Sequence, residues 1–146
     1  MTAKDVSLAK AILTAFESAT FSNSAIAKYA NDLSRPLEDV SKPEIWVSAT
    51  LRPRRLARDA WGDDATVTVI AMSPQKIAGA SGDQDLEDEK DAWLSFIDDE
   101  LLPVIKGFSS EGRKPQTIEF EQRMDPEKIR KLSLFYTKFQ VNFLLV

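Results

Sequence analysis

The C-terminal segment constrains the fold most, because its side chains alternate in character with the period of a β-strand. LFYTKFQVNFLLV (residues 134–146) has an apolar face and a largely polar face, which predicts a strand with one side buried. The first face carries Phe135, Thr137, Phe139, Val141, Phe143 and Leu145, and the second carries Tyr136, Lys138, Gln140 and Asn142. We expect this strand to lie centrally or under a neighbouring subunit, because a bare apolar edge would pair with another chain.

Four other segments are candidate strands. IWVSATL (45–51), ATVTVIAM (65–72) and TIEFE (117–121) alternate or are rich in β-branched residues, and the first two are expected to pair in antiparallel fashion. FSNSAIAKY (21–29) also alternates, although the same segment would tolerate a helix. NDLSRPLEDVSKPE (31–44) contains two prolines among Asn, Asp and Ser, which predicts a connection.

The spacing of apolar residues predicts helices in three places. Residues 4–18 form a short amphipathic pattern, residues 83–106 form the strongest helical pattern, and MDPEKIRKLS (124–133) is typical of a turn followed by a short helix. The stripe of the long helix that should face the core comprises Leu86, Trp93, Leu94, Ile97, Leu101, Val104 and Ile105.

Signals for both ends of the long helix are present. Ser81 and Gln84 are spaced as a capping box, and the acidic residues that follow suit the positive end of the helix dipole. Pro103 is expected to interrupt the last turn, and Gly107 to end the helix.

These elements predict an α+β fold. We expect one domain over residues 1–146, in which a mixed, mainly antiparallel sheet of four to five strands packs against one long and one short helix. A chain of 146 residues buries roughly 68–70% of the surface that it exposes when unfolded, so neither a metal nor a disulfide is needed for folding. The exposed sheet edges are candidates for contacts between copies of the chain.

The segment LRPRRLARDAWGDD (51–64) concentrates positive charge in a chain with a net charge of −4. The connection between the two expected strands, residues 52–64, is thirteen residues long, which exceeds a tight turn and predicts an extended link or arm projecting between them. Its arginines are the candidate interaction residues: Arg52, Arg54, Arg55 and Arg58. They could form exposed ion pairs with Asp59, Asp63 and Asp64, or they could contact phosphates or an acidic partner surface.

The composition excludes several kinds of chemistry. The chain has no cysteine and no histidine, so thiolate nucleophiles, imidazole bases and the common zinc sites are absent. Asp83, Asp85 and Glu87 have the spacing of a calcium loop, but Asp88 stands where that loop needs glycine, and a helix start explains the run better. We therefore expect no enzyme, and no catalytic, cofactor-binding or metal-binding residues. The lack of a leader or long apolar run predicts a protein made in a cytoplasm, with no membrane partner.

The order of these features resembles the tail terminator and tail-completion proteins of the neck of tailed bacteriophages. The resemblance covers residues 21–146. It rests on FS…Y at 21–29, PLEDV, IWVSATLRPRR…R, the second strand, the Trp/Leu/Ile helix stripe and the closing DPEKIRKLSLFYTKFQVNF.

The resemblance implies a virion structural protein. Members of the family form a sixfold ring that ends the tail tube, docks the head connector or head-completion protein, and lets genome DNA pass through its lumen. The 51–64 link would then contact a neighbouring subunit or face the lumen; the acidic residues in the link favour the subunit contact. Another ring of the same neck, such as a head-completion, stopper or adaptor protein, is an alternative, as is a small nucleic-acid-binding module that uses the link.

Overall fold

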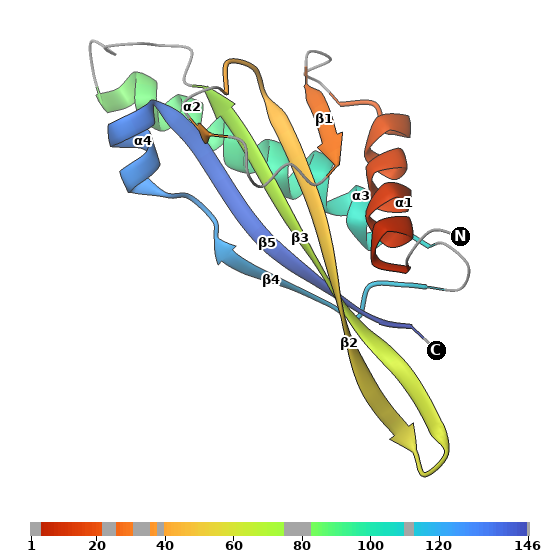
Figure 1. The fold of residues 1–146 in the computed structure, drawn as a ribbon. Helices are drawn as coiled ribbons and strands as arrows, with labels where there is room; N and C mark the ends of the chain where they lie inside the picture. Colours follow the sequence, from red (N-terminus) through yellow and green to blue (C-terminus); the bar gives the residue numbers. More distant parts are fainter. Residues whose placement is uncertain are drawn as a thin grey trace.

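A computed structural model of the protein describes residues 4–21, 26–30, 36–37, 40–74, 83–109 and 113–145. Five strands form a single sheet in the order β1-β2-β3-β5-β4 (Figure 1). The strands are β1 (Ala27–Ala30), β2 (Glu44–Ala57), β3 (Ala60–Pro74), β4 (Thr117–Gln122) and β5 (Leu134–Leu145). β1 and β2 are parallel, and the other neighbours are antiparallel. The predicted α+β fold with a mainly antiparallel sheet is confirmed.

The helices occupy the predicted segments. They are α1 (Lys4–Ser18), α2 (Asp83–Phe96), the π-helical turn η2 (Ile97–Leu101), α3 (Leu102–Lys106) and α4 (Pro126–Leu132). α2, η2 and α3 form one continuous helix that crosses the same face of the sheet as α1 (Figure 1). Of the predicted strand at 21–29, residues 27–29 are in β1 and residues 22–25 lie outside the described residues, as does the Ser81 capping position.

Two apolar clusters bury the two faces of the sheet. The larger lies between the sheet and the helices, with Ile12 and Phe16 of α1 packed near Val47, Val69 and the alternating apolar residues of β5. The smaller lies on the other face, where it comprises Val40, Trp46, Ile70, Met72, Leu134 and Tyr136. Burial on both faces explains why β3 and β5 are the most apolar strands.

The long helix accommodates Pro103 through the π-helical turn that precedes it. Leu102 donates its backbone N–H to the carbonyl of Ile97, one residue farther than in an α-helix. The wider turn also keeps Trp93, Ile97, Leu101 and Ile105 on the sheet side, because their four-residue spacing would drift around a helix of 3.6 residues per turn. The helix thus continues past Pro103, contrary to the expected interruption in the last turn.

The C-terminal strand is central. β5 lies between β3 and β4, with Val141 paired to Val67 on one side and to Ile118 on the other. Of the two arrangements expected for this strand, a central place in the sheet or cover by a neighbouring subunit, the structure shows the central place. Its apolar face is covered within the chain, so it gives no argument for a covering subunit.

Residues 51–64 project between two antiparallel strands as predicted, but they belong to the strands themselves and are not a connection outside them. These residues continue β2 and β3 as a hairpin whose only turn is Arg58–Asp59, with Ala57 paired to Ala60. The strands extend beyond the helices as a projecting two-stranded ribbon (Figure 1). Cross-strand pairing overrides the weak strand propensity of this polar segment. Pro53 is tolerated because the other edge of β2 there pairs with no described strand.

Candidate functional site

We call the projecting ribbon, residues 52–64, the arm. At its base Asp63 and Asp64 pair with β5, whereas from Arg54 to Gly62 the two strands pair only with each other among the described residues. An isolated two-stranded ribbon is marginally stable, so a free arm of this length needs its own local contacts or a partner.

The face of β2 that contacts the core continues onto the arm, where its apolar residues give way to charged and aromatic ones. Leu51 pairs with Ala65 at the edge of the core, and one step farther along the same face Pro53 pairs with Asp63. The next pair on this face is Arg55 with Trp61. The Trp61 side chain is 63% exposed, which is unusual for the residue that occupies a core-side position.

Arg55 holds the tip of the arm together. Its Nε donates to the carbonyl of Ala57 at 3.3 Å, and its Nη2 donates to the carbonyl of Arg58 at 2.6 Å. The same guanidinium lies 5.9 Å from the centre of the Trp61 ring, within cation–π range. Arg55 therefore positions the turn and the indole, and only part of its donor capacity remains for a partner.

The other arginines are distributed differently. Arg52 and Arg58 are exposed, at the base and the tip of the arm respectively, while the side chain of Arg54 lies outside the described part of the structure. Arg52 faces Asp64 directly across the ribbon, and Asp59 is exposed beside Arg58 in the turn. The arm thus carries both signs of charge, with the exposed cations spread along its length rather than gathered on one face.

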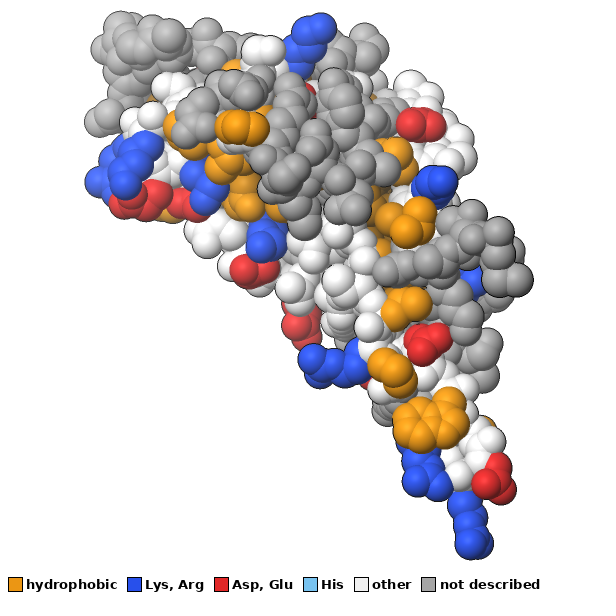
Figure 2. All heavy atoms as spheres, in the orientation of Figure 1, with side chains coloured by type: hydrophobic (Ala, Val, Ile, Leu, Met, Phe, Trp, Pro, Cys, Tyr) orange, Lys and Arg blue, Asp and Glu red, His pale blue; other side chains and the backbone are white. Residues whose placement is uncertain are grey.

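Two apolar side chains complete the surface of the arm. Leu56 stands at the register shift between Arg55 and Ala57 and is 37% exposed, and Trp61 lies on the facing strand. Figure 2 shows hydrophobic side chains on the arm, with basic and acidic side chains beyond them at its tip. Exposed tryptophan and arginine in one small area are typical of a protein contact, because desolvated aromatic and guanidinium groups contribute most to such interfaces. Sequence reasoning missed Trp61, although a tryptophan in the otherwise polar and small stretch DAWGDD (59–64) could have indicated an exposed aromatic residue.

A polar depression of about 520 Å³ lies at the base of the arm. Thr66 donates to Asn142 at 3.1 Å, and Asn142 donates to Thr117 at 2.7 Å, so the side chains here are joined across three strands. This network joins the base of the arm to the sheet.

The side chains whose pKa values differ from the ordinary ones lie away from the arm, in contacts that stabilise the fold. The Arg123 guanidinium donates to Asp98 at 2.8 and 2.5 Å and holds the pKa of that carboxyl below its ordinary value. Lys128 lowers the pKa of Asp125 in the same way, and burial raises the pKa of Tyr136. In the ranges that the structure describes, no group of acidic side chains is arranged to hold a metal ion, and none of the helices is long and apolar enough to cross a membrane.

Among the described surfaces, the arm combines an exposed indole with exposed charged groups, which suits a binding contact. Comparison with known proteins found no family model that matches the chain and no similar curated protein.

Proposed function

We propose that this protein is a virion structural subunit that forms a homo-oligomeric ring at the tail–neck junction of a tailed bacteriophage. The observation that carries the proposal is the arm, which projects from the domain with an exposed Trp61 and exposed Arg52 and Arg58. An element of this kind is a means of joining copies. The location in a phage neck rests on the resemblance of the sequence pattern to the tail terminator family.

The arm accounts for assembly in physical terms. It differs in shape and chemistry from the rest of the surface, so a contact between the arm of one copy and the body of another is heterologous. A heterologous contact repeated by a closing rotation gives a ring, and a sixfold ring is what the resemblance implies. The arginines of the arm suit an acidic surface, which a chain of net charge −4 offers on its own body.

In this proposal the ring is assembled in the host cytoplasm and remains in the virion. It ends the tail tube by binding the tail tube protein, and its other face docks the head-completion or connector protein. Genome DNA passes through the lumen, and the chain catalyses no reaction. A stopper or adaptor protein of the same neck also needs a subunit that joins copies of itself into a ring, so this function is kept as an alternative.

The first test is the mass of the purified protein by light scattering behind a sizing column, over a range of concentrations and at low and high salt. A ring, or a mass that rises with concentration toward one, is the expected result. Immunogold labelling of phage particles then locates the protein, with label expected between head and tail. A protein that stays monomeric in every assembly state, including the particle, would overturn the proposal.

A nucleic-acid-binding module is the second candidate, and the shape of the arm favours it specifically. The major groove of B-DNA admits a two-stranded β-ribbon, and this ribbon carries exposed arginines. Asp59, Asp63 and Asp64 on the same ribbon oppose phosphate contact. Binding to duplex DNA that falls about a hundredfold between 50 and 200 mM salt, as up to four arginine–phosphate contacts would give, and that is lost in Arg58→Ala, would support this second candidate.

A further inference from the structure

We propose that the arm of one copy docks in the groove between α1 and α3 of the next copy, with Trp61 as its apolar anchor. The inference rests on the proposed ring and names the contact that would close it. It combines three observations: a preorganised aromatic tip, an open groove lined by apolar and small side chains, and complementary charge at the groove's end.

The tip is already held in one conformation. Arg55 donates to the carbonyls of Ala57 and Arg58 and lies over the ring of Trp61, so the indole and the turn are fixed relative to each other. Binding by such a tip loses little conformational entropy, and an exposed tryptophan gains the most when a partner covers it.

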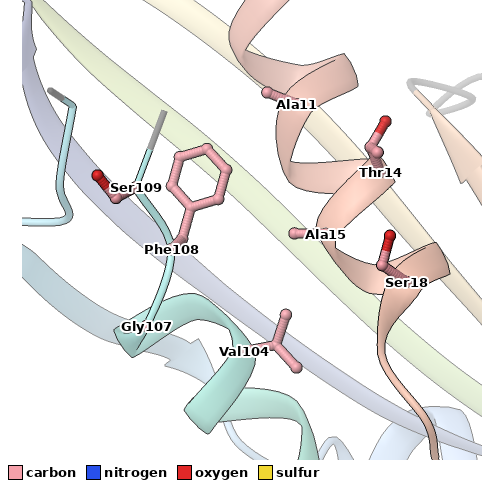
Figure 3. A pocket seen from close by; sticks show the side chains of 8 residues that line it. All are labelled: Ala11, Thr14, Ala15, Ser18, Val104, Gly107, Phe108 and Ser109. Atoms are coloured by element: carbon pink, nitrogen blue, oxygen red, sulfur yellow. The ribbon is translucent and has the colours of Figure 1, made fainter. Parts of the chain in front are cut away.

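The groove lies where α1 passes the end of α3, and its volume is about 440 Å³. Figure 3 shows the methyl groups of Ala11 and Ala15 directed from α1 toward the gap, with Val104 and the Phe108 ring on the opposite side. Small side chains on α1 leave room for a ring. Phe108 gives the groove a rigid aromatic wall, because it is buried and packs edge-on against Phe143 with centroids 5.8 Å apart.

The charge at the groove suits the arm. α1 ends at Ser18, which lines the groove, and the last turn of this helix contains no basic residue. The carbonyls at the C-terminus of α1 carry partial negative charge, whereas Lys106 in the last turn of α3 places a positive charge beside the opposite side of the groove. Arg58, exposed at the tip of the arm, is the cation placed to meet this end of the groove when Trp61 enters it.

The contact has to form between copies. The tip points away from the helices, which lie on the body of the domain (Figure 1). A second copy of the chain is therefore the occupant, and each copy offers one arm and one groove, which is the arrangement that a ring repeats.

Cysteine cross-linking tests the contact directly, because the natural chain has no cysteine. Asp59→Cys places a thiol at the tip, Ser18→Cys places one at the groove, and Glu119→Cys on exposed β4 is the matched control. The D59C and S18C chains are mixed and treated with a short bis-maleimide reagent. A covalent heterodimer is expected from this pair and not from D59C mixed with E119C. The double variant D59C/S18C should give a ladder whose highest band reports the number of subunits in the ring.

The outcomes separate this inference from the proposed function. If light scattering and particle labelling show the ring but no arm–groove cross-link forms, the docking site is wrong and the ring stands. If no oligomer forms in any state, both fail. Protection of D59C from the reagent by duplex DNA, without cross-links, would assign the arm to nucleic acid and overturn the docking proposal. Trp61→Ala should weaken self-association about 30-fold, whereas Leu132→Ala, on the other sheet face, should not weaken association of the folded protein.

Discussion

The guanidinium of Arg55 lies across the arm from Trp61, 5.9 Å from the centre of its ring, while the same group donates to the carbonyls of Ala57 and Arg58. One side chain therefore joins both strands of the arm to the turn. This matters because the outer arm has no third strand among the described residues to support it, and a two-stranded ribbon alone is marginally stable.

Replacing Arg55 with alanine should loosen the tip without unfolding the domain. Amide hydrogen exchange at residues 56–60 is expected to become faster, because the two bonds to turn carbonyls and the contact with Trp61 are lost. The free energy of unfolding should change by less than about 1 kcal/mol, since the side chain is exposed. Arg52→Ala is the control at the base of the arm. Unchanged exchange at the tip in R55A would mean that pairing of the strands alone holds the arm.

Thr137 joins the long helix to the sheet and should be costly to replace. This fully buried hydroxyl accepts from Trp93 Nε1 at 2.9 Å and donates to the carbonyl of Arg123 at 2.8 Å. Thr137→Val keeps the shape but leaves the indole N–H and the carbonyl without this partner. We expect a loss of about 1–3 kcal/mol in urea unfolding. Thr50→Val, at an exposed strand position, should change stability by less than about 0.5 kcal/mol. Equal stability of the two variants would show that water replaces the hydroxyl.

The elements with strong periodicity were predictable from the sequence. α1 has the predicted bounds, Asp125 and Pro126 start α4 where the sequence places a turn, and the alternation over 134–146 predicts β5. In each case one face is buried in the core, so the pattern of apolar residues reports the packing. The central place of β5 was one of two alternatives, because alternation shows that a face is buried and does not show what lies beside the strand.

The arm was not predictable in detail. Arg52, Pro53 and Arg54 have no apolar alternation, and the turn Arg58–Asp59 lacks the Asn-Gly or Asp-Gly signal of a tight hairpin. These residues are strands because a long partner strand pairs with them, and pairing between distant residues leaves no local signal. For the same reason the hydrogen bonds from Arg55 to the turn carbonyls could not be predicted from the sequence. The arginines could be named as candidate interaction residues only as a group.

The pair of Asp98 and Arg123 should make stability depend on pH in the acid range. The hydrogen bonds and charge of Arg123 lower the pKa of Asp98 below 3.8 in the folded state. A carboxyl whose pKa is lower in the folded state than in the unfolded state stabilises the protein at every pH above its unfolded-state pKa. This contribution is lost as the pH falls through the folded-state pKa. Both side chains are partly exposed, so the contribution is up to about 1 kcal/mol.

Asp98→Asn tests this dependence. The variant should be less stable than the parent at pH 7, and the difference should shrink as the pH falls below 3.8 and the parent carboxyl takes up its proton. Asp99→Asn, on the same turn and exposed, serves as the control for the loss of one negative charge. A difference between D98N and the parent that stays constant from pH 7 to pH 2 would contradict the role of the ion pair.

Asp125 both caps α4 and pairs with Lys128, and two substitutions separate these roles. Its Oδ1 accepts from the backbone N–H of Glu127 at 3.0 Å, and its Oδ2 accepts from Lys128 Nζ at 2.8 Å. Asp125→Ala removes both contacts and should destabilise the protein by about 0.5–2 kcal/mol in urea unfolding. Asp125→Ser keeps a cap without the charge, so most of the stability should return. If D125S is as unstable as D125A, the Lys128 pair is the dominant contact of Asp125.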